Sequence, residues 1–210
     1  MFQLETISRC DNMAYAVSVL SQFIQNPGQA HLEALKHVIV YLGCTKGLWL
    51  TFGGRTKTLV EGYCDADWAG QKHWHSISGY SFHMGKGAVS WSSKKQYIIV
   101  LSSTEAKYIA QTHAAKEALW LRSFLKEIRG LHDAPLTINC DNQGAIALSK
   151  DNKFHAHTKH IDIRYHFIRK AVEDKKIEVI YIPTDDNTSN IFTKPLTKLK
   201  FRHFVEMCQQ

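Results

Sequence analysis

The chain of 210 residues is 44% apolar and 21% charged, a composition typical of a globular protein with enough apolar material for a core. Its formal net charge of +7 and pI of about 9.1 favour a polyanionic partner. The first residues are too polar for a signal peptide and no apolar run is long enough to span a bilayer, so we expect an intracellular, cytoplasmic protein with no membrane partner.

Two helices are predicted at the start of the chain. Apolar residues recur at helical spacing over residues 13–24, and Asn-Pro-Gly at 26–28 interrupts them. The helical period resumes over residues 31–42 and stops at Gly43. No strand pattern is found before residue 48.

Strand patterns follow the two helices. Residues 48–54 and 58–68 have strand character and are separated by a Gly-Gly-Arg-Thr turn. Residues 77–85 and 88–95 are further strands, joined through Gly85-Lys86-Gly87. This order predicts a three-stranded antiparallel meander from about residue 58 to residue 95.

The second half of the chain alternates helix and strand. A long helix is predicted from near Ser102 to about Gly130, with an apolar face that places Tyr108 and Trp120 in the core. Shorter elements follow: a strand over 136–141, helices over 144–150 and 160–174, a strand over 177–183 and a short helix over 187–193. A meander followed by alternating elements predicts an α/β fold, with a five-stranded mixed sheet flanked by helices and an N-terminal helical extension.

Three carboxylates fall at the ends of these elements. Asp65 ends the first central strand, Glu105 lies in the first turn of the long helix, and Asp141 ends the strand over 136–141. Carboxylates that meet at one place repel one another, and a divalent cation relieves the repulsion. Oxygen ligands without cysteine favour Mg²⁺ or Mn²⁺ as the cofactor, and two such ions would support in-line hydrolysis of a phosphodiester.

Each carboxylate also has a simpler interpretation. Ser102 and Glu105 have the spacing of a capping box, and Asp141 could cap the helix that follows it. Asp65 could be a turn residue, with Asp67 as the ligand in its place. The order strand-Asp, helix-Glu, strand-Asp is what favours a metal site.

Several blocks together resemble one known family. YCDADWAG, LSSTEAKYIA, CDNQGAIAL, TKHIDIRYHFIR and IPTDDNTSNIFTKPL look like the ribonuclease H domain of Ty1/copia-type retrotransposon Pol polyproteins, in the family's order. Residues 9–48 are similar to the thumb-like C-terminal end of the same polyprotein's reverse transcriptase. The resemblance implies a helical reverse-transcriptase remnant over 1–57, a ribonuclease H-like domain over 58–205 and a tail over 206–210.

The resemblance implies a Mg²⁺- or Mn²⁺-dependent endonuclease that hydrolyses the RNA strand of an RNA–DNA hybrid. It assigns Asp65, Glu105 and Asp141 as metal ligands, and it completes the catalytic set at Asn190, where the family has a fourth Asp. Asparagine offers one neutral oxygen and no charge, so a catalytically silent hybrid-binding remnant is an alternative. A further alternative is an interaction fragment in which residues 1–57 dock onto an upstream reverse transcriptase.

The same resemblance implies two other substrate-binding positions. Gln143 looks like the family's contact to the backbone of the hybrid, and His75 stands where the family has an Arg. Lys107 replaces the Glu of the family's STEAEY block at a helix position that we expect to be exposed, with little effect.

A polar, basic strand end is a further candidate contact to nucleic acid. Ser93, Lys94 and Lys95 could bind phosphates and sugars, with Trp91 or Trp74 stacking on bases. The simpler interpretation is a solvated hairpin edge protected by lysines. The basic amphipathic segment over 196–208 is expected to be a packing helix rather than a membrane anchor.

A run of histidines raises the question of a zinc site. His155, His157 and His160 form an HxHxxH run, but no fourth ligand is evident, and a polar loop before a helix is the simpler interpretation. The five cysteines form no CxxC pair, so we expect reduced and mostly buried thiols. The loop over 183–187 contains no His, although bacterial-type enzymes of this fold often carry a catalytic His there.

Overall fold

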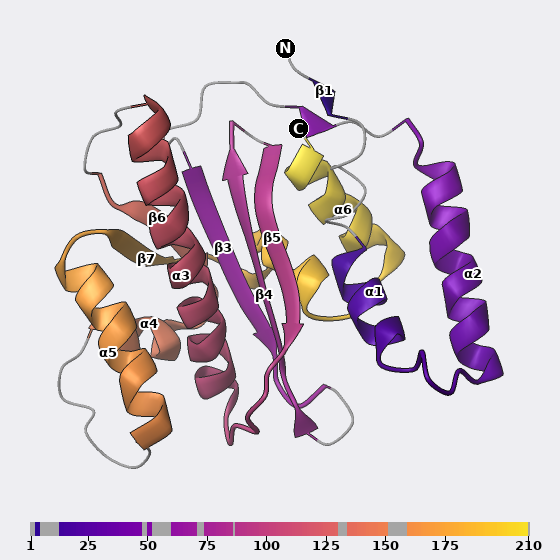
Figure 1. The fold of residues 1–210 in the computed structure, drawn as a ribbon, viewed down its shortest axis with the longest axis horizontal. Helices are drawn as coiled ribbons and strands as arrows, with labels where there is room; N and C mark the ends of the chain where they lie inside the picture. The colour runs from indigo at the N-terminus through magenta and orange to yellow at the C-terminus, as the bar shows by residue number, and fades with distance from the viewer. Residues whose placement is uncertain are drawn as a thin grey trace.

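The computed structural model describes residues 3–4, 13–47, 50–51, 60–70, 74–85, 87–129, 134–150 and 159–209. Figure 1 shows a central sheet with helices packed around it. None of the helices in these ranges is long and apolar enough to cross a membrane.

The five strands form one mixed sheet in the order β5-β4-β3-β6-β7, which confirms the predicted fold class. The antiparallel meander consists of β3 (Val60–Asp67), β4 (Ile77–Met84) and β5 (Gly87–Lys95). On the other side of β3, the strands β6 (Leu136–Cys140) and β7 (Ile177–Tyr181) run parallel to it. Since β3 and β6 are parallel neighbours, their carboxyl ends lie side by side.

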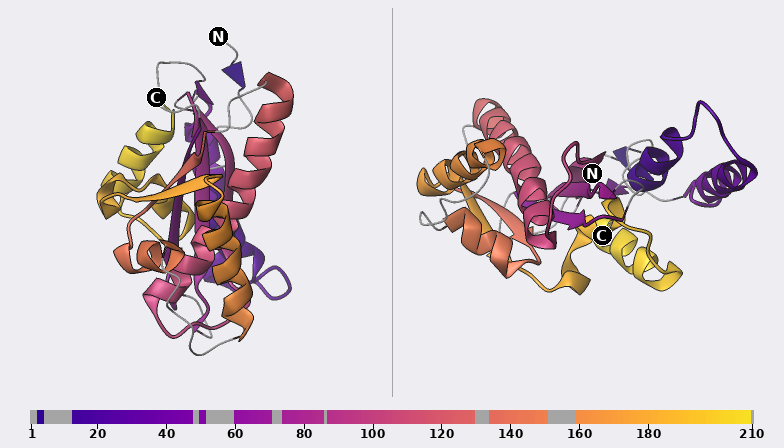
Figure 2. Two further views of the ribbon diagram at one scale, coloured as in Figure 1. Left: turned by 90° about the vertical axis from the view of Figure 1, so that its left-hand side faces the viewer. Right: turned by 90° about the horizontal axis from the view of Figure 1, so that it is seen from below.

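Helices cover both faces of this sheet (Figure 2). One face carries α3 (Ser103–Arg129), and α4 (Gln143–Lys150) and α5 (Lys159–Glu173) pack beside α3. Two 3₁₀ turns follow β7, η3 (Thr184–Asp186) and η4 (Thr188–Phe192), and η4 lies against β3 and β4 on the opposite face. The last helix, α6 (Lys198–Gln209), packs on η4 and β5, as expected for the basic C-terminal segment.

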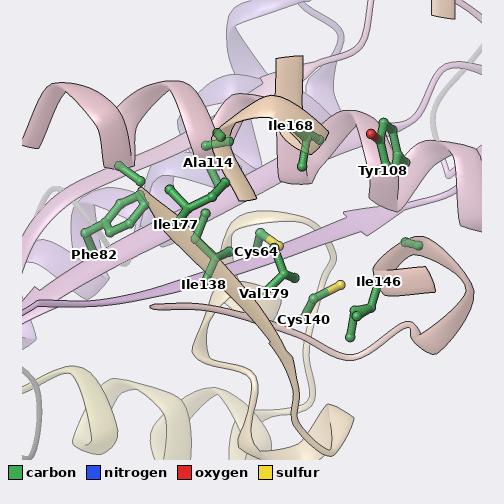
Figure 3. Close-up of a cluster of buried hydrophobic side chains, with 14 of the residues drawn as sticks. Cys64, Phe82, Tyr108, Ala114, Ile138, Cys140, Ile146, Ile168, Ile177 and Val179 are labelled. Carbon is green, nitrogen blue, oxygen red and sulfur yellow. The ribbon is translucent and has the colours of Figure 1, made fainter. Parts of the chain in front are cut away.

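The main core lies between the sheet and α3, α4 and α5 (Figure 3). Phe82, Tyr108 and Ile138 are among its fully buried side chains. Cys64 and Cys140, on adjacent strands, are free and buried, whereas Cys44 is free and exposed. The thiols of Cys64 and Cys140 therefore serve as small apolar core groups.

Trp120 does not join this core, contrary to the prediction. Its side chain is 57% exposed and stacks on Phe124, with ring centroids 5.2 Å apart. The reason is the direction of the side chain, because Ala118 and Leu121, on either side of Trp120 in α3, are buried in the core. Successive side chains of a helix are about 100° apart, and Trp120 lies on a side of α3 that the core does not cover.

The N-terminal helices form as predicted, and the first of them packs on the sheet's β5 edge. They are α1 (Ala14–Ser21) and α2 (Gln29–Cys44), and Figure 1 shows α1 next to β5 and α6. A second cluster of buried side chains, Ile191, Phe192 and Phe204, is covered by Ala14 of α1 and Trp91 of β5. Trp91 is therefore a packing residue rather than the stacking platform suggested as one alternative.

A short two-stranded sheet lies near the chain's start. The strand β1 (Gln3–Leu4) pairs antiparallel with β2 (Leu50–Thr51). This corrects the expectation that no strand precedes residue 48. The remainder of the strand predicted over 48–54 lies outside the described residues.

His83 on β4 is a buried titratable group whose protonation the fold opposes. Its side chain is 8% exposed, its Nε2 lies 3.0 Å from Ser81 Oγ, and its ring contacts Tyr63 edge-on. Burial lowers the pKa of His83 from 6.5 to about 4. Above pH 6.5 the imidazole is neutral in both the folded and the unfolded chain, so the full stability is present. Below that pH only the unfolded chain gains the proton.

We therefore expect the free energy of unfolding to fall by about 3 kcal/mol as the pH drops from 6.5 to 4, through His83 alone. Urea unfolding at a series of pH values measures this slope. In the variant His83→Gln the slope should flatten, whereas in the control His166→Gln, which alters an exposed histidine of α5, it should persist. An unchanged slope in His83→Gln would refute the assignment.

Candidate functional site

Asp65 is a charged side chain buried inside the protein. It lies near the end of β3, and its side chain is 0% exposed. Its Oδ2 accepts a hydrogen bond from Thr193 Oγ1 at 2.5 Å and lies 3.3 Å from Lys194 Nζ. Its Oδ1 lies 3.1 Å from Lys107 Nζ. A carboxylate removed from water in this way needs such positive partners to remain ionised.

Asp141 lies beside Asp65 because the parallel strands β3 and β6 end together. Cys64 and Cys140 are paired in the register of these strands, and each precedes one of the two aspartates. Asp141 Oδ2 accepts a hydrogen bond from Thr184 Oγ1 at 2.9 Å. Its Oδ1 accepts one from Lys107 Nζ at 2.5 Å. The structure thus brings two of the three predicted ligands to one place.

Lys107 joins the two aspartates, which corrects the expectation of an exposed position. Its side chain is 15% exposed, and its ammonium bridges Asp65 and Asp141. The start of α3 is held against the sheet by Gln96, whose Nε2 donates to Ser78 Oγ and to Ala106 O. These hydrogen bonds direct Lys107, the residue after Ala106, toward the carboxyl ends of β3 and β6.

Glu105, the predicted second ligand, caps α3. Its Oε2 accepts a hydrogen bond from the backbone N–H of Leu101 at 3.0 Å. In return, Ser102 Oγ accepts one from the backbone N–H of Glu105 at 3.2 Å. These two bonds resemble the capping box that the sequence offered as the simpler interpretation, except that Glu105 binds the N–H of the residue before the cap. The assignment of Glu105 to the metal site is not supported by this geometry.

Asn190 lies in η4, where its side chain donates hydrogen bonds to backbone carbonyl groups. Its Nδ2 donates to Thr184 O at 2.7 Å and to Asn187 O at 2.8 Å. Its Oδ1 is buried and has no hydrogen-bond partner among the described residues. A carboxylate in this orientation would place an anionic oxygen against two carbonyl oxygens. The local structure therefore suits the neutral amide.

These residues do not fit a divalent metal ion. Within the described ranges, no group of three or more His, Cys, Asp or Glu side chains is placed to hold one. The charges of Asp65 and Asp141 are already balanced by the ammonium groups of Lys107 and Lys194. Mg²⁺ and Mn²⁺ require oxygen ligands that carry surplus negative charge. The predicted two-ion cofactor is therefore not supported by the side chains present.

The pKa shifts follow from this network. Burial would raise the pKa of Asp65, but the ammonium groups of Lys107 and Lys194 outweigh burial and lower the pKa. Burial would lower the pKa of Lys107, but Asp65 and Asp141 raise it above its ordinary value. The half-buried Asp67 behaves differently, since burial raises its pKa more than Lys194 lowers it. Asp65 and Lys107 are thus both held in their charged forms.

The predicted basic strand end lies in register with Asp65. Asp65 pairs with Gly79 of β4, and Gly79 pairs with Ser93 of β5. A Cβ on Gly79 would lie 2.7 Å from Thr193 Cγ2, so only glycine lets η4 pack so closely. Lys94, the next residue, is exposed, and its Nζ lies 5.4 Å from the centre of the Tyr97 ring.

The other predicted contact residues are more scattered. His75 is half-buried and its Nδ1 lies 2.8 Å from Gln96 O, which ties it to the end of β5. Gln143 is exposed at the start of α4, two residues after Asp141. Trp74 is 71% exposed. Of the predicted histidine run, His155 and His157 lie outside the described residues, as does the side chain of His160.

Comparison with known proteins places the whole chain among transposon polyproteins. No protein-family model matches it. The chain is 45% identical over 200 residues, 95% of its length, to the retrovirus-related Pol polyprotein from transposon TNT 1-94 of Nicotiana tabacum. It is 40% identical over 197 residues, 92% of its length, to that from transposon RE1 of Arabidopsis thaliana. The chain spans only 15% and 13% of these relatives.

The solved structures similar to this one include LC11-RNase H1 in complex with an RNA/DNA hybrid. The sequence identity is 14% and the TM-score is 0.47. The similarity covers 64% of this chain and 93% of that one.

Proposed function

We propose that this chain binds RNA–DNA hybrids without hydrolysing them. The chain belongs to the Pol polyproteins of Ty1/copia-type retrotransposons, as their ribonuclease H domain. The proposal selects the silent, hybrid-binding alternative over the Mg²⁺-dependent endonuclease. Hydrolysis through two metal ions needs carboxylates that hold the ions and orient a water molecule. The carboxylates of Asp65 and Asp141 instead bind the ammonium group of Lys107.

The position of Lys107 supports the proposed lack of hydrolysis. The space between Asp65 and Asp141 contains the ammonium of Lys107, 3.1 Å from one carboxylate and 2.5 Å from the other. An ammonium there repels a divalent cation and supplies no oxygen ligand. Since Glu105 is engaged as a cap and Asn190 is neutral, neither of them supplies a third anionic ligand.

Binding is supported by charge and by position. The chain carries a formal charge of +7, and a duplex presents two lines of phosphates. Ser93 lies in the same row of the sheet as Asp65, two strands away, and a strand spacing of about 4.8 Å puts it roughly 10 Å from Asp65. Lys94 and Lys95 follow it directly at the end of β5, and Lys95 shares the face of Ser93 whereas Lys94 points to the other face. This spacing lets one strand of a duplex pass the aspartate pair while the long lysine side chains at the end of β5 contact its phosphates.

The experiment measures binding and cleavage on one labelled hybrid. We expect the full chain to bind the hybrid with salt-dependent affinity and to leave the RNA strand intact with either Mg²⁺ or Mn²⁺. In the double variant Lys94→Gln/Lys95→Gln, affinity should fall, and the slope of log affinity against log salt should decrease by about 1–2. The matched control is Lys116→Gln/Lys126→Gln, which removes two exposed lysines of α3 and should leave the slope unchanged.

Two outcomes would contradict the proposal. Cleavage that disappears in the variant Asp65→Asn would show that the site is an active nuclease. Equal affinity for the hybrid in the two double variants would show that the basic end of β5 does not contact the duplex. Competition with double-stranded DNA of the same sequence then tests for RNA-dependent contacts, which would read the 2′-hydroxyls.

A further inference from the structure

We infer that the Lys107 ammonium is a built-in cation that takes the place of a divalent metal ion, so that residue 107 decides whether this site binds a metal. The inference deepens the proposed function and rests on it for the absence of hydrolysis. Its test measures ion binding without any nucleic acid, so the two proposals can fail separately.

The position of Lys107 is that of a central cation. Its Nζ contacts one oxygen of each aspartate, and the other oxygen of each aspartate accepts a threonine hydroxyl hydrogen bond. Thr193 serves Asp65 and Thr184 serves Asp141 in this way. The two carboxylates are therefore oriented from outside by hydroxyls and joined at the centre by one positive group. Such outer hydrogen bonds are the arrangement that orients carboxylate ligands around a metal ion.

One oxygen atom near the aspartate pair has capacity that the lysine does not use. Asn190 Oδ1 is buried and lacks a hydrogen-bond partner among the described residues. Both oxygens of Asp65, in contrast, have partners, Lys107 Nζ at Oδ1 and Thr193 Oγ1 at Oδ2. Asn190 is 2% exposed, so water does not easily compensate its free oxygen. Asn190 donates to Thr184 O, and Thr193 donates to Asn190 O as well as to Asp65, so this oxygen belongs to the network that holds the aspartate pair.

The sequence supports position 107 as the deciding residue. In the block that resembles the family, this is the position of a glutamate, and Lys107 is the departure from it. The hydrogen bond from Gln96 Nε2 to Ala106 O fixes the backbone next to position 107, and this backbone directs the side chain toward the aspartate pair. A glutamate here would add a third carboxylate and remove the ammonium. Ligand charge is a main determinant of divalent-ion affinity.

The test is the variant Lys107→Glu in the full chain, with Mn²⁺ as the probe. Isothermal titration and the electron paramagnetic resonance of free Mn²⁺ measure binding. The matched control is Lys116→Glu, which makes the same change of charge at an exposed position of the same helix. We expect saturable binding to Lys107→Glu, at least about tenfold tighter than to Lys116→Glu or to the wild type. The variant Asp65→Asn/Lys107→Glu should lose this binding.

Folding is measured on the same proteins. Three neighbouring carboxylates repel, so Lys107→Glu should unfold at a lower temperature than the wild type without metal and regain stability when Mn²⁺ is added. The neutral variant Lys107→Gln should fold and show no gain with Mn²⁺. Tight Mn²⁺ binding by the wild type would overturn the inference. A folded Lys107→Glu that binds no better than Lys116→Glu would also overturn it, as would failure of Lys107→Glu to fold at any Mn²⁺ concentration while Lys107→Gln folds.

Discussion

Replacing Lys107 with Met is expected to lower the free energy of unfolding by about 3–5 kcal/mol, the range for removing one partner of a buried ion pair. Methionine keeps most of the apolar stem but removes the charge. Asp65 and Asp141 would then face each other without the ammonium that joins them. Lys194, 3.3 Å from Asp65, remains as the other cation and favours the lower part of this range. Urea unfolding at neutral pH measures the loss.

The control for this variant is Lys116→Met, an exposed position of the same helix, which should change stability by less than about 0.5 kcal/mol. Adding Asp65→Asn and Asp141→Asn to Lys107→Met should recover part of the loss, because amides carry no charge that needs a partner. If Lys107→Met were as stable as Lys116→Met, the ammonium would not be the group that stabilises the aspartate pair. A greater loss in the triple variant would contradict the same conclusion.

Replacing Phe192 with Ala is expected to cost about 3–5 kcal/mol as well, through loss of buried area and the cavity left behind. Phe192 is 0% exposed and lies in the cluster with Ile191 and Phe204 that joins η4 to α6. Its Cβ also lies 2.8 Å from the place a Cβ on Gly79 would occupy, so it packs directly on β4. The same unfolding experiment measures the change.

Leu199→Ala is the matched control for Phe192→Ala, because Leu199 is an apolar residue of α6 that is 80% exposed. Its effect should stay within about 0.5 kcal/mol. Hydrogen exchange should also show faster exchange of the α6 amides in Phe192→Ala than in Leu199→Ala, since α6 rests on this cluster. Equal exchange in the two variants would mean that Phe192 does not hold α6 to the sheet.

The sheet could be predicted from the sequence because its signals are local. The meander β3-β4-β5 follows from alternating strands that are separated by turn residues such as Gly85 and Gly87. The later strands and helices follow from their apolar patterns, and the parallel placement of β6 then brings Asp65 and Asp141 together. The proximity of the two aspartates could therefore be predicted from the sequence.

Whether Glu105 or Lys107 faces that pair could not be decided from residue type. Two residues along a helix correspond to a rotation of about 200°, so the two side chains point to nearly opposite sides. A glutamate in the first turn of a helix fits the sequence pattern of a helix cap and that of a metal ligand equally well. Buried residues continue the helical spacing from both positions, Tyr108 and Thr112 from Glu105 and Gln111 and Ala114 from Lys107, so the apolar pattern of α3 does not separate them either.

The exposure of Trp120 could not be predicted from the sequence for a different reason. Its helical spacing with Phe124 is that of a core face, but α3 has a second set of apolar residues at helical spacing, Ala114, Ala118 and Leu121, and this set packs on the sheet. The apolar pattern alone does not decide which of the two sets faces the core.

The bridging position of Lys107 also has a genetic consequence. Lysine codons begin with A and glutamate codons begin with G, and the remaining two bases are shared. A single transition at the first base therefore exchanges the internal cation for a carboxylate at the point where it meets Asp65 and Asp141. Copies of such an element would need only that one nucleotide change to pass between the two states of the site, in either direction.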